Sequence, residues 1–143
     1  MKVLLDSSVL VAAFVESHPR NEPAAALFGR IRQKQWALFV AAHSLAETYS
    51  VMTATPFNPR ISPSDARGVM SDNLDEAHIV PLTGDDYLAV IDLLAGLGLS
   101  GGAVYDALLF RAAQNARVDR IYTFNAAHFL RFGAKGKPDI VTP

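Results

Sequence analysis

Short hydrophobic runs alternate with amphipathic helical stretches along this chain. Five runs rich in β-branched residues or Phe predict strands at Lys2–Asp6, Ala37–Ala41, His78–Leu82, Arg120–Phe124 and Asp139–Thr142. Helical patterns fill the gaps between them. Such alternation implies right-handed crossovers and a mostly parallel sheet with helices on both faces. We therefore expect an α/β fold of three layers, α/β/α, around a five-stranded sheet.

Two helices can be placed from the spacing of their apolar residues. The segment Asn21–Gln33 carries Pro23 near its start, where proline favours a helix. A second segment has Asp92 on its polar face and an apolar stripe on the other. The residues of that stripe are Tyr87, Val90, Ile91, Leu94 and Leu97. The proline-rich segment Thr55–Ser64 is typical of a surface loop.

The composition fits one independently folded unit. The chain has 143 residues, half of them hydrophobic, and we expect a single domain over residues 1–143. It contains no Cys, which excludes disulfides, zinc–thiolate sites and cysteine nucleophiles and fits a reducing compartment. The longest run without a charged residue has 13 residues, fewer than the roughly 18 that a membrane span needs. We therefore expect a soluble, cytoplasmic protein without a membrane segment.

Positive charge collects near the carboxyl terminus although the formal net charge is only −1. Between Arg111 and Lys137 the only acid is Asp119. The basic residues there are Arg111, Arg117, Arg120, Arg131, Lys135 and Lys137. This distribution fits a polyanionic partner and an ordinary solvated basic face equally well.

Two acids stand where a parallel sheet places its ligands, beyond the carboxyl ends of the strands or at the start of a helix. Asp6 follows the first predicted strand, and it either caps the next helix or leaves that role to Ser7 and Ser8. Asp106 lies in the first turn of another predicted helix, beside apolar Leu109. The helix dipole favours an acid in the first turn, which is one explanation of this placement. The other is a cation or a functional partner that compensates a carboxylate on an apolar face.

Other polar residues have weaker signals. Glu47 faces away from the apolar stripe of its helix, so by itself it is interpreted as solvated. Thr123 and Asn125 offer neutral oxygens after the fourth strand, although Asn is equally suited to a turn. His128 is interpreted as a core histidine or a phosphate contact rather than as a proton carrier.

In their order and spacing, four motifs resemble those of PIN-domain ribonucleases, and most of all the VapC-type toxins of toxin–antitoxin pairs. The motifs are Leu4–Leu10, Ala46–Glu47, Gly101–Leu108 and Thr123–Asn125, the last followed by Phe129. The resemblance extends from residue 3 to about residue 129. It implies the fold already expected, with a cluster of acids at one end of the sheet.

The resemblance also implies a catalytic site. Three acids are expected to hold Mg²⁺ or Mn²⁺: Asp6, Glu47 and Asp106. Asn125 stands where many members of the family carry a fourth acid, so this chain has one formal charge fewer there. Ser7 or Thr123 can add a hydroxyl near the metal. Hard divalent cations prefer such oxygen ligands, and they make a bound water easier to deprotonate.

The implied activity is hydrolysis of RNA phosphodiesters by metal-activated water. The expected partners are the RNA substrate, a cognate antitoxin protein and a second copy of the chain in a homodimer. Residues expected to contact RNA are Ser7, Thr123, Arg111, Arg117 and Arg131.

Three other functions remain open. A phospho-receiver also has acids at the end of a parallel sheet, and Asp85 and Asp86 follow the third strand. That function needs a lysine beyond the last strand, where this chain ends in Ile140-Val141-Thr142-Pro143. A catalytically weak or inactive nucleic-acid-binding domain of the same fold is a second alternative, and a metal-dependent phosphatase is a third.

Overall fold

The computed structural model describes residues 1–132, 136 and 138–143. Lys135 and Lys137 of the basic segment lie outside the described residues. The strands are β1 (Lys2–Leu5), β2 (Ala37–Ala41), β3 (His78–Val80), β4 (Arg120–Tyr122) and β5 (Asp139–Val141). The helices are α1 (Ser7–Phe14), α2 (Asn21–Gln33), α3 (Ala42–Ala54), α4 (Pro63–Leu74), α5 (Gly84–Leu97), α6 (Ala103–Ala116) and α7 (Ala126–Phe129), and a 3₁₀ turn follows at Leu130–Phe132.

The described strands form one parallel sheet in the order β3-β2-β1-β4-β5. Strand β1 lies at its centre, where Val3 pairs with Leu38 of β2 on one side and with Arg120 of β4 on the other. Every predicted strand is confirmed, with ends within two residues of those expected. The predicted parallel sheet is confirmed as well.

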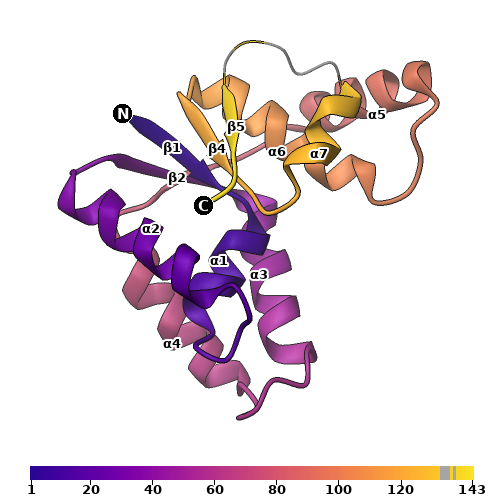
Figure 1. The fold of residues 1–143 in the computed structure, drawn as a ribbon. Helices are drawn as coiled ribbons and strands as arrows, with labels where there is room; N and C mark the ends of the chain where they lie inside the picture. The colour runs from indigo at the N-terminus through magenta and orange to yellow at the C-terminus, as the bar shows by residue number, and fades with distance from the viewer. Residues whose placement is uncertain (133–135, 137) are drawn as a thin grey trace.

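Helices cover both faces of this sheet, which confirms the three-layer fold (Figure 1). Alternate residues of β1 point to opposite faces, as the pleat of a strand requires. Val3 and Leu5 pack in a core with α1 and α2, which includes Leu10 and Leu27. Leu4 packs in a second core with α6 on the other face. The central strand is therefore buried on both faces, and its end is held firmly.

The predicted helix Asn21–Gln33 is confirmed at both ends. Of the five residues predicted for the apolar stripe of α5, only two are buried. Val90 and Leu94 are buried, but Tyr87, Ile91 and Leu97 are exposed. Helix α5 packs chiefly on α6 rather than on the sheet, so only a narrow strip of its surface is covered. No helix in the described ranges is long and apolar enough to cross a bilayer.

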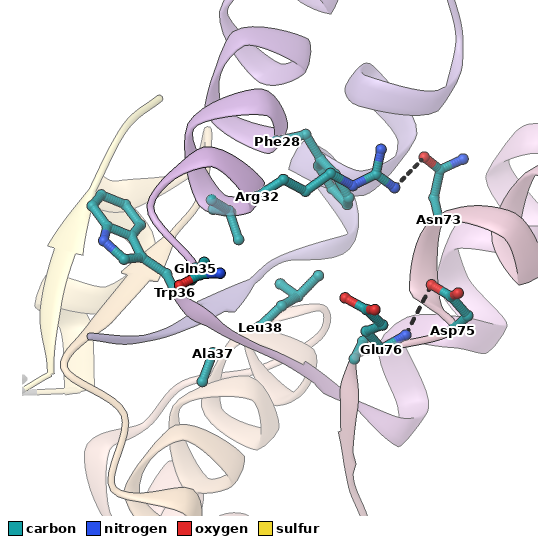
Figure 2. A pocket seen from close by; sticks show the side chains of 11 residues that line it. Phe28, Arg32, Gln35, Trp36, Ala37, Leu38, Asn73, Asp75 and Glu76 are labelled. Carbon is teal, nitrogen blue, oxygen red and sulfur yellow. Dashed lines mark hydrogen bonds between the residues drawn. The ribbon is translucent and has the colours of Figure 1, made fainter.

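A cavity of about 380 Å³ lies between the end of α2, the start of β2 and the end of α4 (Figure 2). Two hydrogen bonds join polar groups that line it. Arg32 Nη2 donates a hydrogen bond to Asn73 Oδ1 at 3.1 Å, and the backbone N–H of Glu76 donates to Asp75 Oδ1 at 2.9 Å. This cavity lies at the amino end of β2, whereas ligands of parallel sheets bind at the carboxyl ends.

Candidate active site

A hollow of about 410 Å³ opens beyond the carboxyl end of β1. Four residues expected at the site line it: Asp6, Glu47, Asp106 and Asn125. They come from the end of β1, from α3, from the first turn of α6 and from the segment after β4. Residues separated by up to 119 positions thus meet at one end of the sheet. We call this hollow the acidic hollow.

Asp6 is held in place by three hydroxyl groups. Ser8 Oγ and Thr123 Oγ1 each donate a hydrogen bond to Asp6 Oδ2 at 2.7 Å, and Ser7 Oγ donates to Oδ1 at 3.3 Å. Asp6 occupies the cap position of α1, yet its side chain makes no capping hydrogen bond. The expectation that Ser7 and Ser8 cap this helix is wrong, because their hydroxyls point to the carboxylate instead. Asp6 is thereby oriented and buried, with an exposed fraction of 7%.

Glu47 is half-buried, which corrects the expectation of a solvated side chain. The apolar stripe predicted for this helix is Leu45, Tyr49 and Met52. The buried residues of α3 are instead Ser44, Thr48 and Met52, so the helix is turned relative to that stripe and leaves Tyr49 exposed. Thr48 can be buried here because its Oγ1 donates to the Ser44 carbonyl at 2.7 Å, whereas the buried Ser44 Oγ meets no hydrogen-bond partner among the described residues. Burial raises the pKa of Glu47 to about 7, and the charges of Asp6 and Asp106 add to the rise.

Asp106 has a histidine as its neighbour. His128 Nδ1 lies 3.1 Å from Asp106 Oδ2. Burial raises the pKa of Asp106, and His128 and Arg131 act in the opposite direction. His128 is exposed and lines the acidic hollow, so its interpretation as a core histidine is wrong. The sequence signal that could have placed His128 near the acids is its position three residues beyond Asn125, in the short helix α7.

Asn125 precedes α7 without capping it through its side chain. Its backbone N–H donates to Thr123 Oγ1 at 2.9 Å, and that same hydroxyl donates to Asp6. The buried Thr123 therefore joins the end of β4 to the carboxylate at the end of β1. The Asn125 side chain lines the acidic hollow at the position of the missing fourth acid.

Sequence reasoning did not single out His43, which lies beside Glu47. Its Nε2 atom is 3.6 Å from Glu47 Oε1, one helical turn along α3. Neither ring nitrogen meets a hydrogen-bond partner among the described residues, and both are buried. Burial lowers the pKa of His43, so the ring is neutral near pH 7. The i, i+4 spacing of His43 and Glu47 was the available signal.

The expected basic residues divide into two groups. Arg131 lines the acidic hollow, whereas Arg111 and Arg117 do not. Arg111 Nε donates to Asp86 Oδ1 at 2.8 Å. Arg117 ends α6 in a left-handed conformation, at the end of the helix opposite Asp106.

Asp86 is occupied by a structural role. It forms a capping box with Thr83 at the start of α5 and accepts a hydrogen bond from Asn115 of α6 at 3.2 Å. The Thr83 backbone N–H and then Arg111 hold its pKa well below the usual range. Asp86 is thus engaged in joining α5 to α6, and this explains Asp86 without a phospho-receiver.

The donor chemistry of the acidic hollow fits a hard divalent cation. Three carboxylates line it, and burial, together with the charges of neighbouring carboxylates, raises the pKa of Glu47 and of Asp106. Mg²⁺ usually keeps several waters and takes one or two carboxylates directly. No group of three His, Asp or Glu side chains in the described part of the chain is close enough to enclose an ion unaided.

Comparisons with known proteins agree with this geometry. The family model "PIN domain" matches residues 3–135. The chain is 34% identical to "Ribonuclease VapC40" of Mycobacterium tuberculosis over 111 residues, 78% of each chain. It is 31% identical to "Ribonuclease VapC27" of the same species over 115 residues, which cover 80% of this chain and 79% of the relative.

Solved structures share the fold. The structure of VapBC2 from Rickettsia felis bound to a promoter DNA fragment has a TM-score of 0.71, with 16% identity over 100% of this chain and 99% of that one. Mycobacterium tuberculosis VapC20, described as a Sarcin-Ricin loop cleaving toxin, has a TM-score of 0.69, with 17% identity over 90% of this chain and 93% of that one.

Proposed function

The chain belongs to the PIN-domain family, and on that basis we propose that it is a divalent-metal-dependent endoribonuclease, the toxin of a type II toxin–antitoxin pair. The observation that carries this proposal is the meeting of Asp6, Glu47 and Asp106 in one hollow. Two relatives named ribonucleases, with identities of 34% and 31% over about four fifths of the chain, support RNA as the substrate. Structures of VapBC complexes support an antitoxin partner. A homodimer and a cytoplasmic location are part of the same proposal.

Asp6, Asp106 and Glu47 are the residues that would hold the metal, Mg²⁺ or Mn²⁺. When bound, the ion supplies positive charge that makes an attacking water more acidic and offsets the charge growing on the phosphate oxygens. Asp6 is oriented for this role in advance by Ser8 and Thr123. A ligand whose position is fixed loses little conformational freedom when the ion arrives.

Glu47 has the protonation behaviour of a group that can accept a proton near neutral pH. Its pKa is about 7 in the metal-free protein, near the optimum for a general base at physiological pH, and a bound cation would lower it by offsetting the charges of Asp6 and Asp106. It can therefore take the proton of the attacking water or serve as a ligand. His128 holds Asp106, and Arg131 lies at the rim, where its guanidinium can contact a substrate phosphate. The phosphodiester is then cut by water without a covalent enzyme intermediate.

Cleavage of RNA by the purified protein tests this function. With Mn²⁺, the parent should cleave RNA from its own host, and EDTA should stop cleavage. Asp6→Asn and Asp106→Asn should each abolish cleavage while the fold remains, because each removes a ligand charge at nearly constant side-chain size. Combining the two should cost little more than one alone, since the acids act as a unit.

Asp92→Asn is the matched control. Asp92 lies exposed on α5, so removing its charge should leave cleavage unchanged. Cleavage by Asp6→Asn or Asp106→Asn at the rate of the parent would contradict the proposal. RNA that is bound but never cut would favour a nucleic-acid-binding domain instead. Hydrolysis of phosphomonoesters in place of RNA would favour a phosphatase.

A further inference from the structure

A second hollow of about 410 Å³ adjoins the acidic hollow, and the two share Ser7 and Asn125. Its other walls come from α1, from the loop between α1 and α2, from α3 and from the segment after β4. The residues that give it its character are Val11, His18, Arg20, Val51 and Phe124. We call it the side hollow. Its lining surface is mainly apolar, in contrast to the carboxylates that line the acidic hollow.

Two flat side chains meet in the side hollow. The Arg20 guanidinium carbon lies 4.8 Å from the centroid of the Phe124 ring. Stacked guanidinium and aromatic planes are the surfaces on which proteins hold unpaired bases of nucleic acids. Burial lowers the pKa of His18, and the charge of Arg20 adds to that effect, so its ring is neutral near pH 7. His18 Nδ1 accepts the backbone N–H of Arg20, so the proton of the neutral ring is on Nε2, which can donate a hydrogen bond to a base edge.

Hydrogen bonds fix the walls of the side hollow. Asn21 Nδ2 donates to the carbonyl of Ala12 at 2.9 Å, which ties the loop after α1 to that helix. The backbone N–H of Arg20 donates to His18 Nδ1 at 3.0 Å. On the opposite wall, the backbone N–H of Phe124 donates to Ser8 Oγ at 3.3 Å. The hollow is therefore formed before a ligand arrives, as is usual for binding pockets.

We propose that the side hollow receives a nucleobase of the RNA strand, from a nucleotide beside the phosphodiester that is cut. This inference rests on the proposed ribonuclease function. The shared wall of Ser7 and Asn125 means that a phosphate in the acidic hollow and a base in the side hollow can belong to neighbouring nucleotides. Arg20 adds a positive charge, which suits a polyanionic strand. The side hollow then contributes to the sequence preference of cleavage.

Binding of RNA with single missing bases tests the inference directly. The full-length Asp106→Asn protein is titrated with fluorescein-labelled ten-nucleotide RNAs in which each position in turn is abasic. Loss of the base that occupies the side hollow should weaken binding about 5- to 150-fold, the range for one stacked base. Abasic residues at distant positions should have a small effect.

Val51→Trp in the Asp106→Asn protein supplies the second arm. Val51 is 42% exposed on α3, so a larger side chain can fill the side hollow without entering the core. The double variant should then bind intact RNA with the weak affinity that the Asp106→Asn protein has for the sensitive abasic RNA. Removing the base should not weaken RNA binding by the double variant any further. Leu88→Trp, at an exposed position of α5, is the matched control and should leave RNA binding unchanged.

In the protein with Asp106 intact, Arg20→Ala should relax the preference of cleavage for the base beside the cleaved phosphodiester. Arg20→Lys should not retain that preference, because lysine has no planar face. Equal binding of every abasic RNA, or unchanged RNA binding by the Val51→Trp protein, overturns the inference. If Val51→Trp weakens binding of a protein partner but not of RNA, the side hollow is a peptide site and the inference is also wrong. Cleavage by the parent with Mn²⁺ tests the ribonuclease function separately, so the two failures are distinguishable.

Discussion

At the scale of single residues, the charge state of Glu47 follows from its two acidic neighbours. Its pKa is raised from 4.5 to about 7 in the folded protein, by burial and by the charges of Asp6 and Asp106. Between these values the folded state therefore binds more protons than the unfolded state. Without metal, the contribution of Glu47 to the free energy of unfolding should fall as pH rises through this window.

Glu47→Gln should remove that pH dependence. In EDTA, the variant should gain stability relative to the parent as the pH rises from about 4.5 to above 7, because the parent alone carries the ionised carboxylate. Urea unfolding at both pH values measures this. Asp92→Asn, on the exposed face of α5, should follow the parent. Stability profiles of Glu47→Gln and the parent that run parallel across the window would show that Glu47 titrates normally.

Asn125 offers a second prediction at this scale. Asn125→Asp places a fourth carboxylate on the wall of the acidic hollow, so it should lower the Mg²⁺ concentration needed for half-maximal cleavage. Cleavage rates over a Mg²⁺ titration give the measurement. Gln114→Glu adds the same charge at an exposed position of α6 and should leave the titration unchanged. A titration curve of Asn125→Asp identical to that of the parent would mean that the missing acid does not limit metal occupancy.

The sequence indicates a site residue only where a local pattern sets the position of that residue in the fold. Asp6 follows a buried strand in a parallel sheet, so its place at the sheet end was predictable. The half-buried state of Glu47 was not, since it depends on a polar buried face formed by Ser44 and Thr48. His128 and Arg111 depend on partners 22 and 25 residues away in the chain, which no local pattern reveals.

At the scale of elements, the central strand β1 was predictable because a strand buried on both faces is marked by a short, dense apolar run. Helix α5 was harder, because apolar residues surround it on several sides. Its covered strip, Val90 and Leu94, is set by the position of α6 rather than by its own periodicity. What fixes α5 is its start, where Thr83 and Asp86 form a capping box and Asp86 also binds Arg111.

Thr83→Ala should therefore lower the free energy of unfolding by about 1 kcal/mol, the usual cost of a lost helix cap. The Thr83 hydroxyl accepts the backbone N–H of Asp86 at 3.2 Å, and alanine cannot replace it. Chemical denaturation of the two proteins measures the difference. Thr142→Ala, at an exposed position outside the helices, should change little. Loss of RNA cleavage by folded Thr83→Ala would contradict the separation of this cap from the acidic hollow.

At the scale of the whole molecule, the fold brings like charges together at one end of the sheet. The end of β1 and the helices α3 and α6 converge there (Figure 1). Buried apolar side chains anchor each of them, among them Leu5 of β1, Met52 of α3 and Leu109 of α6. Packing thus holds the carboxylates in place, and the raised pKa values of Glu47 and Asp106 reflect the cost of their burial and, in second place, of their repulsion. A cation bound in the acidic hollow should return part of that free energy.

Metal should consequently stabilise the folded protein, by about 2.7 kcal/mol at a free concentration of 100 Kd. Asp106→Asn should lose most of this gain, because a ligand charge is gone. In EDTA, however, it should be at least as stable as the parent, since one repelling carboxylate has been removed from a half-buried position. Asp92→Asn should keep the full gain. Thermal unfolding in EDTA and in excess Mn²⁺ makes all three comparisons. A parent Tm that is equal in both buffers would rule out a metal site in the acidic hollow, because an ion bound only by the folded state must raise the Tm.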